Sequence, residues 1–402
     1  MQNTAKVNQL AFNTNEAFLP HLETLLKTYI AFNREPARAI ILHNIADVEN
    51  SKIAQDFINN FKAYPNLEIN FHYVSPQDFL KLGVREQDAN NVANYRLLLP
   101  TLPYQGIVLY LDVDVMIVDN IEELFNAEVL QGNSLGVVPD LCNIRQVLNR
   151  KKFFREKCFI PEVLECNFGY NNLYFNSGVL LCDLDKLRSK AKNPGQDVWT
   201  ENLGKYLDRK TLMPDQDFLN LIHLNDKTEI SSVYNYPMRY LISQRFYLNY
   251  YGWDKVEPPA DKVKKVRPKI LHFLEKRKQW DSLAPEWTDL YNYFKQQSIT
   301  QIVENSTTIY TDLLSKYYQY YEYEPCLEEL NNTPALQLTR KSFRKLWKEK
   351  REPWQINQIL INYSYAKIPL FFEKYRFKKA IIKTHKDESY AKEIYEKKGK
   401  LL

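Results

Sequence analysis

Glycine is scarce in this chain, which has only 10 glycines among its 402 residues. Neither G-x-G-x-x-G nor G-x-x-x-x-G-K-[S/T] occurs, so the sequence lacks the glycine-rich loops that bind phosphate through backbone N–H groups. If the chain binds a nucleotide, we therefore expect a metal ion rather than backbone amides to hold the diphosphate.

Long hydrophobic runs are absent too. No stretch of about 18 apolar residues occurs, so no transmembrane helix is expected. The first residues, MQNTAKVNQLAFNTNEAF, lack the basic-then-apolar order of a secretory signal. The cysteines are odd in number and form no C-x-x-C pair, which favours reduced thiols in a cytoplasm over a disulfide framework or a zinc site. They are Cys142, Cys158, Cys166, Cys182 and Cys326.

Positive charge is concentrated near the end of the sequence. The net charge is +5, yet residues 337–402 hold 18 lysines and arginines against 7 aspartates and glutamates, a net of +11. Aromatic residues are interleaved with these basic ones, which is typical of a peripheral contact with an anionic membrane. The alternative is the solvated basic face of a helical accessory domain. Nucleic acid is not an expected partner, because no recognition motif accompanies the charge.

Short apolar runs alternate with helical patterns in the first part of the chain. Strand-like segments cover residues 6–12, 39–43, 67–74 and 107–111, and helical patterns cover 16–30, 51–61 and 91–102. This alternation predicts an α/β fold with a mostly parallel sheet and helices on both faces. From residue 283 the sequence is rich in Tyr, Lys, Glu and Leu at helical spacing. We therefore expect one domain over 1–282 and a smaller helical, basic region over 283–402.

The segment VLYLDVDVMIVDN, residues 108–120, places Asp112 and Asp114 at the end of a predicted strand. Residues i and i+2 of a strand point to the same face, so the two carboxylates are expected side by side. Like charges at that distance repel, and a bound divalent cation would offset the repulsion. The alternative is that Asp114 and Asp119 cap the following turn.

Two further segments carry polar residues beside apolar runs. In LYFNSGVLLCDLDKLR, Asn176 and Gly178 precede an apolar stretch, and Gly178 would let a ligand or a second backbone approach closely. The alternative there is a bulge in an internal strand. In MPDQDFLNLI, Asp215 and Gln216 precede a helical pattern, and Asp215 as a helix N-cap is the alternative to a functional role.

The segment ILHFLEKRKQW places His272 in an apolar strand, followed by the basic residues Lys276, Arg277 and Lys278. A metal ligand is one interpretation of His272, and a core histidine is the other. The basic residues form either part of a phosphate site or a solvated loop.

Six segments in the same order resemble family 8 glycosyltransferases, the retaining enzymes that include glycogenin and bacterial lipopolysaccharide galactosyl- and glucosyltransferases. They are AFNTN, NYRLLLP, VLYLDVDVMIVDNIEELF, YFNSGVLLCDL, DQDFLN and HFLEKRKQW. The resemblance runs from about residue 8 to residue 280, and the third and fourth segments are the most specific. It implies a GT-A fold, in which a Rossmann-like mixed sheet is covered by helices on both faces.

The same resemblance implies the site residues. Asp112, Asp114 and His272 would bind Mn²⁺, or Mg²⁺ in its place, and the diphosphate of a UDP-sugar would complete the coordination. The residues implied to contact the donor are Ala11, Asn13, Asn15 and Val113 at uracil and ribose, Arg96 at the phosphates or sugar, Asp140, Asn176 and Ser177 at the sugar, and Lys278 at the diphosphate. Asp215 and Gln216 would lie at the anomeric carbon.

The chemistry that the resemblance implies is a transfer with retention. Cleavage of the sugar–phosphate bond leaves negative charge on UDP, which the metal and Lys278 would stabilise. Retention requires either a covalent intermediate or attack on the same face, and we favour the second because Gln216 is a poor nucleophile. The sequence departs from the family pattern at three positions: Asn13 replaces Asp, Glu275 replaces Gly and Gln279 replaces Pro.

The expected activity is therefore transfer of galactose or glucose from a UDP-hexose to a glycan or glycolipid acceptor, namely the core of lipopolysaccharide or lipooligosaccharide. The enzyme would be cytoplasmic, with its basic region on the inner face of the membrane. Two alternatives remain open: a protein acceptor such as an adhesin, and a non-catalytic module that binds a nucleotide or a glycan.

Overall fold

A computed structural model of the chain describes residues 7–140, 174–207, 214–237, 264–266, 268–274, 278–280, 285–305 and 322–324. Two compact units are distinguished, one made of Met1–Met238 with Lys264–Glu328 and the other of Arg239–Val263 with Glu329–Leu402. The second unit lies outside the described residues. The predicted helical region over 283–402 lies outside them for the most part, so its membrane contact stays a prediction.

A seven-stranded mixed sheet forms the centre of the first unit, in the order β3-β2-β1-β4-β7-β6-β8. Its strands are β1 (Asn8–Thr14), β2 (Ala37–His43), β3 (Leu67–Tyr73), β4 (Ile107–Leu111), β6 (Leu135–Pro139), β7 (Phe175–Asp183) and β8 (Lys227–Glu229). Strands β3, β2, β1 and β4 are parallel, as predicted. Strand β7 runs antiparallel to both β4 and β6, so the sheet as a whole is mixed.

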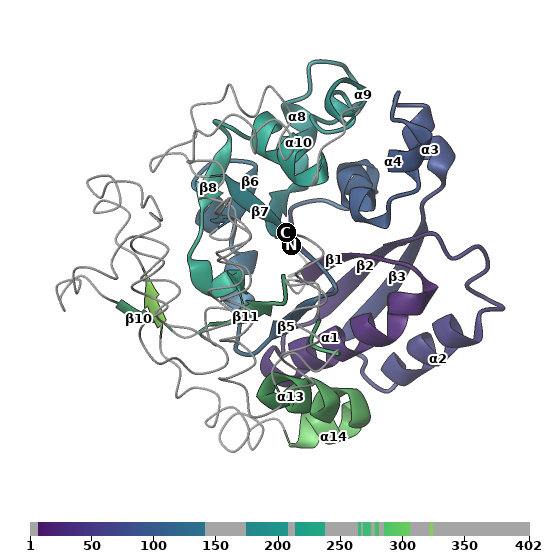
Figure 1. Cartoon of the computed structure of the whole chain (residues 1–402), viewed down its shortest axis with the longest axis vertical. Coiled ribbons are helices and arrows are strands. Elements are labelled where there is room, and N and C mark those ends of the chain that lie inside the picture. Colours follow the sequence, from purple (N-terminus) through teal and green to yellow (C-terminus); the bar gives the residue numbers. More distant parts are fainter. Residues whose placement is uncertain are drawn as a thin grey trace, which may run out of the picture. The chain divides into compact units, whose positions relative to one another are not determined.

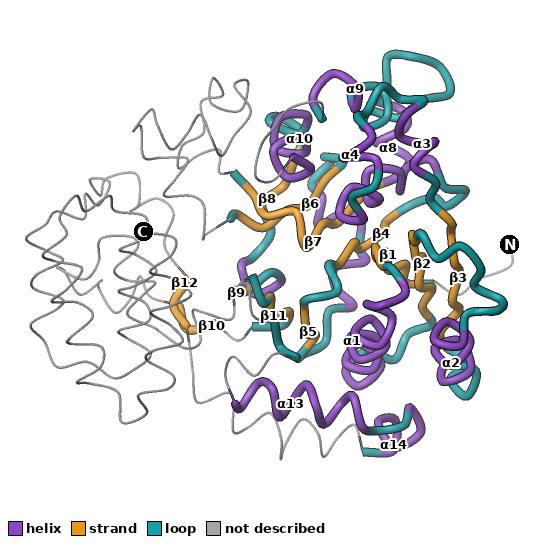
Figure 2. Tube along the Cα trace, turned by 45° about the vertical axis from the view of Figure 1, so that its right-hand side comes forward, coloured by secondary structure: helices purple, strands orange, loops and turns teal. Residues whose placement is uncertain are grey.

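Helices cover both faces of this sheet, as Figure 2 shows. Helices α1 (Leu19–Phe32) and α2 (Lys52–Phe61) lie on one face, and α4 (Glu86–Ala89), α8 (Leu184–Ser189) and α10 (Pro214–Ile222) lie on the other. The remaining short helices are η1 (Glu16–Phe18), α3 (Pro76–Leu80), η3 (Glu122–Phe125), η4 (Ala127–Leu130), α9 (Leu203–Tyr206) and η5 (Ser232–Tyr234). The side chain of Ser51 accepts a hydrogen bond from Ala54 N–H and so fixes the start of α2.

The segment predicted as a helix over 91–102 forms the 3₁₀ helix η2 (Val92–Thr101). Pro100, within its last turn, has no N–H to donate. Because η2 packs on β1 and β2, its residue Arg96 is buried against the sheet.

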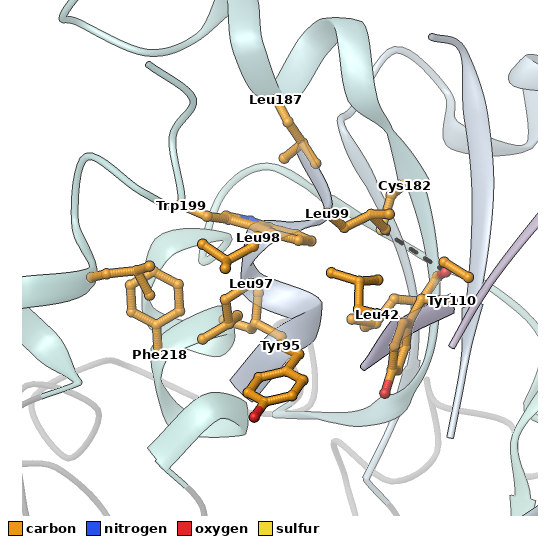
Figure 3. Packing of buried hydrophobic residues seen from close by; sticks show 14 of the residues in the cluster. Leu42, Tyr95, Leu97, Leu98, Leu99, Tyr110, Cys182, Leu187, Trp199 and Phe218 are labelled. Atoms are coloured by element: carbon orange, nitrogen blue, oxygen red, sulfur yellow. Dashed lines mark hydrogen bonds between the residues drawn. The ribbon is translucent and has the colours of Figure 1, made fainter. Parts of the chain in front are cut away.

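The main hydrophobic core lies between the sheet and the helices of one face. Its centre is Trp199, whose indole lies between Leu187 and Leu98 in Figure 3, with Phe218 beside them. Cys182 of β7 is part of this core, and its thiol is free, in agreement with the expected reduced state for the one cysteine that the structure describes. Burial of these large side chains stabilises the frame on which the polar residues are placed.

A small sheet of order β5-β11-β9 adjoins the end of β4. It consists of β5 (Val115–Ile117), β9 (Tyr236–Pro237) and β11 (Ile270–His272), and it brings the residues around 272 beside those that follow β4. Helices α13 (Pro285–Gln296) and α14 (Ile299–Glu304) pack on α1, as Figure 1 shows, and β10 (Lys264–Val266) pairs with β12 (Glu322–Glu324). Among the residues described, no helix is both long enough and apolar enough to span a membrane.

Candidate active site

The two aspartates of the Asp-x-Asp segment lie just beyond the carboxyl end of β4. The strand predicted over 107–111 is β4, and both aspartates follow it; the strand geometry used to place them side by side does not apply, because Val113 and Asp114 form a turn before β5 begins. The carboxylates converge nevertheless. The turn is held because Phe273 N–H donates to the Asp114 carbonyl at 3.0 Å, next to the pairing of β11 with β5.

His272 joins this pair of carboxylates because it lies opposite Val115 in the β11–β5 ladder. One ligand atom from each of Asp112, Asp114 and His272 can be chosen so that all three lie within 4.8 Å of one another. His272 is buried and the aspartates are half-buried. The three predicted metal ligands are therefore brought together from two parts of the sequence: the segment that follows β4, which carries both aspartates, and strand β11.

Asp112 is held by two groups that the surrounding core fixes in place. Tyr110 Oη donates to Asp112 Oδ1 at 2.7 Å, and a terminal nitrogen of Arg96 lies 2.9 Å from the same oxygen. Burial raises the pKa of Asp112 above its ordinary value, although the charge of Arg96 opposes the shift. Burial alone would lower the pKa of Arg96, but Asp112, Tyr110, Asp215 and Asp114 together outweigh burial and raise it, so the guanidinium stays charged.

For the pKa of Asp114, the neighbouring side chains outweigh burial. Burial would raise its pKa, but His272 and Lys278 outweigh burial and lower the pKa below its ordinary value. Lys278 Nζ lies 2.5 Å from Asp114 Oδ2 and also donates to the carbonyl of Phe273 at 2.9 Å. Asp114 is therefore an ionised carboxylate, and Lys278, which is predicted to bind the diphosphate, lies beside the predicted metal ligands.

Gly178 lies directly against this cluster. A Cβ at this position would be 2.3 Å from His272 Cε1 and 2.8 Å from Asp112 Oδ2, well inside contact distance. The ladder between β6 and β7 also shifts register between Val137 and Val138, whose partners are Leu180 and Asn176. The strand is therefore irregular here, as the bulge interpretation predicts, and the missing side chain lets the side chains of His272 and Asp112 lie close to β7; the approach of a ligand stays a prediction.

A second polar group surrounds Gln216 in the first turn of α10. Gln216 Oε1 accepts from Ser177 N–H at 3.1 Å and from Asn176 Nδ2 at 3.2 Å, and Gln216 Nε2 donates to Asp140 Oδ2 at 2.9 Å. All four of these residues are buried. The residues predicted at the sugar and at the anomeric carbon are thus brought together.

Asp215 connects this group to Arg96. Its Oδ2 accepts from Ser177 Oγ at 3.2 Å and lies 3.6 Å from Arg96 Nε. Asp215 lies inside α10, after Pro214, so the N-cap alternative is wrong. Arg96 also donates to the Ser177 carbonyl at 2.5 Å and stacks over the Tyr110 ring, 4.5 Å from its centroid, so it links the Asp112–Asp114–His272 cluster to the group around Gln216.

The residues predicted at the nucleobase and ribose lie at the end of β1 and in the Asp-x-Asp turn. Ala11 is fully buried within the core, and Val113 is half-buried between the aspartates. Asn13 is 7% exposed; its Nδ2 donates to the Ala93 carbonyl at 3.1 Å, and its Oδ1 has no hydrogen-bond partner among the described residues. Asn15 caps η1 by accepting from Phe18 N–H.

Two residues at the site were not predicted. Tyr110 could have been, because it lies two residues before Asp112 on a strand and so shares its face. Asn235 could not, because it belongs to no motif: its Oδ1 lies 2.7 Å from His272 Nδ1, and its Nδ2 donates to Asn176 Oδ1 at 2.9 Å. The departure at residue 275 lies outside the described residues, whereas Gln279 is described and buried.

The side chains at the cluster fit a divalent cation. Two carboxylates and an imidazole suit a borderline ion such as Mn²⁺. The absence of a side chain at Gly178 lets His272 and Asp112 lie close together, and His272 uses Nδ1 on Asn235, so Nε2 is the nitrogen that faces Asp114, at 3.2 Å.

The family model described as "Glycosyl transferase family 8" matches residues 9–284. The chain belongs to glycosyl transferase family 8. The family prediction is thereby confirmed, and the matched range contains every predicted site residue.

Curated relatives match over shorter stretches. "Probable galacturonosyltransferase-like 6" of Arabidopsis thaliana is 26% identical over 170 residues, which cover 40% of this chain and 46% of that protein. "Glycosyltransferase-like protein LARGE" of Caenorhabditis elegans is 28% identical over 239 residues, covering 56% of this chain and 34% of that protein. The chain thus spans less than half the length of these relatives.

Solved structures share the fold at low identity. An active-site mutant of LgtC is 22% identical with a TM-score of 0.50, and the match covers 71% of this chain and 95% of that one. The bifunctional enzyme WbbM is 15% identical with a TM-score of 0.53, covering 76% of this chain and 52% of that one. These likenesses confirm the predicted GT-A fold.

Proposed function

We propose that this chain is a metal-dependent, retaining transferase that moves galactose or glucose from a UDP-sugar to a glycan acceptor. The observation that carries the proposal is the convergence of Asp112, Asp114 and His272 at the carboxyl end of β4, in a chain of this family. Ligands of α/β sheets bind at that end of the strands.

The charges around the cluster are suited to a diphosphate only once a dication is present. Arg96 and Lys278 already pair with Asp112 and Asp114, so these two carboxylates are balanced by two cations. A bound Mn²⁺ or Mg²⁺ would therefore add net positive charge, act as a Lewis acid and stabilise negative charge on the leaving UDP. The ammonium of Lys278 would stabilise the same charge.

Asn13 supports uracil as the base. Its buried Oδ1 is an acceptor without a partner, and such an atom is costly unless a ligand satisfies it. The imide N–H of uracil is a donor, as is the N1–H of guanine, whereas the ring nitrogens on the pairing edges of adenine and cytosine are acceptors, so Asn13 favours uracil over adenine and cytosine only. Replacement of the family's usual aspartate by Asn13 thus keeps the acceptor that this donor requires.

The sugar side is suited to stabilising an oxocarbenium-like transition state. The carboxylates of Asp215 and Asp140 lie next to Gln216, and three neighbours hold the Gln216 amide by hydrogen bonds. An amide oxygen that already accepts two hydrogen bonds is a poor nucleophile, which supports attack by the acceptor on the face that UDP leaves. Asp215 and Gln216 then act as electrostatic and positioning groups.

The acceptor that we propose is the core of lipopolysaccharide or lipooligosaccharide, reached from the cytoplasm while the basic region over 283–402 contacts the anionic membrane. The names of the plant relatives add galacturonic acid to the donor sugars that need testing. A protein acceptor is the alternative. It would be favoured by transfer to purified protein without transfer to glycolipid or oligosaccharide.

The test is release of UDP from a panel of UDP-sugars with Mn²⁺ and with EDTA, since many transferases slowly hydrolyse their donor. The panel contains UDP-galactose, UDP-glucose and UDP-galacturonate. We expect metal-dependent release from one sugar, lost in Asp114→Ala and kept in Asp56→Ala, an exposed aspartate of α2. No release from any sugar, while UDP still binds, would instead indicate a non-catalytic binding module.

A further inference from the structure

We propose that Asn235 is a positioning residue that holds His272 as the Nδ1–H tautomer and directs Nε2 into the metal site. Nothing in the sequence motifs includes Asn235, which lies at the end of η5, just before β9. The proposal rests on the proposed metal dependence, and its tests include one that needs no metal.

A backbone N–H group fixes the orientation of the first amide in this set, that of Asn176. Gly178 N–H can only donate, and it lies 2.9 Å from one side-chain atom of Asn176. That atom must therefore be the acceptor Oδ1 rather than the amide nitrogen. The orientation of the Asn176 amide is thus fixed by the irregular strand β7.

Asn176 in turn fixes the orientation of the Asn235 amide. The same Oδ1 of Asn176 lies 2.9 Å from the Asn235 amide, and only Nδ2 of Asn235 can donate to it. The other end of the amide, Oδ1, then faces His272 Nδ1 at 2.7 Å. Because an amide oxygen cannot donate, the proton must be on Nδ1 of His272. Nε2, facing Asp114, is then the atom that can offer a lone pair to a metal.

The three side chains that form these hydrogen bonds are buried. Asn176, Asn235 and His272 are 9%, 3% and 2% exposed, so water can hardly replace a lost hydrogen bond. The backbone also holds Asn235 close to His272, because Asn235 directly precedes β9, β9 pairs with β11, and His272 lies opposite Pro237. A histidine ligand whose other nitrogen donates to a fixed oxygen is oriented and more basic.

The hydrogen bonds from Asn235 through Asn176 also extend to Gln216, which is predicted to lie at the anomeric carbon. Asn176 uses its Nδ2 on Gln216 Oε1, and the backbone N–H of Ser177 fixes that oxygen independently. Asn235 therefore has two separable functions: its oxygen orients His272, and its nitrogen supports the Asn176–Gln216 pair. Conservative substitution can separate them.

Mn²⁺ affinity, measured by calorimetry with UDP present, tests the first function. We expect Asn235→Ala to weaken Mn²⁺ binding by about 10- to 100-fold, the usual effect of removing such a partner. Asn235→Asp keeps an acceptor for Nδ1–H, so its affinity should stay near that of wild type, while UDP release falls because the donor to Asn176 is lost. Asn33→Ala, a buried asparagine with no bond to the site, controls for loss of stability. Wild-type affinity in Asn235→Ala would overturn the proposal.

The tautomer can be read without any metal. In ¹⁵N-histidine-labelled protein, assigned with His272→Gln, we expect a proton on Nδ1 of His272, whether or not Nε2 also donates to Asp114, and loss of this Nδ1–H signature in Asn235→Ala. An Nε2–H tautomer in wild type would overturn the proposal whatever the activity. Failure of the proposed function looks different: Mn²⁺ binds and depends on Asn235, yet no UDP-sugar is turned over.

Discussion

Gly178→Ala is a small change that should weaken the proposed metal site of this protein. The new Cβ would lie 2.3 Å from His272 Cε1, whereas ordinary contacts begin near 3.4 Å. His272 or the strand must therefore move by roughly 1 Å, since close-packed interiors have no room to spare. Asp112 Oδ2, at 2.8 Å, would be displaced as well.

The strand cannot easily provide that shift. Gly178 is in β7, which is buried between β4 and β6, and its carbonyl accepts from Asp112 N–H at 2.8 Å. We therefore expect the side chains to move, which separates two of the three ligand atoms. The expected result is a fall in Mn²⁺ affinity of at least about 10-fold, together with a stability loss of about 1–3 kcal/mol from overpacking.

The assay combines calorimetric Mn²⁺ titration in the presence of UDP with the thermal unfolding midpoint. Gly204→Ala is the matched control, because its Cβ would lie 2.3 Å from the Leu82 carbonyl oxygen, away from the metal ligands. Both variants should lose stability, and only Gly178→Ala should lose metal affinity. Wild-type affinity in Gly178→Ala, or an equal loss in both variants, would refute the reasoning.

Two further predictions concern a hydrogen bond and a buried histidine. Tyr110→Phe removes the hydrogen bond to Asp112 but keeps the ring, so Mn²⁺ binding should weaken by about 1–2 kcal/mol in calorimetry; unchanged binding would show that Tyr110 does not hold Asp112. Burial lowers the pKa of His43 from 6.5 to about 4, and its Nδ1 accepts from Ile45 N–H. The unfolded chain then binds more protons between these values, so this contribution to stability is complete above pH 6.5 and is lost as the pH falls toward 4, by up to about 3 kcal/mol. Urea unfolding should show a shallower pH dependence in His43→Asn, which keeps an acceptor, and equal slopes would contradict the assignment.

The parallel half of the sheet could be predicted from the sequence because three of its four strands, β1, β2 and β4, are buried on both faces. The continuous apolar run at 107–111 became β4 with the same bounds, and Ser51 began the helix that follows β2. The direction of β7 could not be predicted, because the apolar pattern of a buried strand is the same whichever way the chain runs.

The candidate site residues were predicted from six motifs that occur in a fixed order along the chain. The errors in that prediction have local causes. Asp112 and Asp114 were placed on one face of a strand, but the chain turns after Leu111 to enter a second sheet. Asn235 was missed because its role depends on a contact with a residue 37 positions away, and no periodicity encodes such a contact.

The central claim is that Asp112, Asp114 and His272 bind a dication that also holds the donor diphosphate. The most direct test is pulsed electron paramagnetic resonance of Mn²⁺ bound to the wild-type protein with UDP. We predict hyperfine coupling to both nitrogen and phosphorus, with the nitrogen coupling lost in His272→Gln. Bound Mn²⁺ without nitrogen coupling, or without phosphorus coupling when UDP is present, would contradict the account.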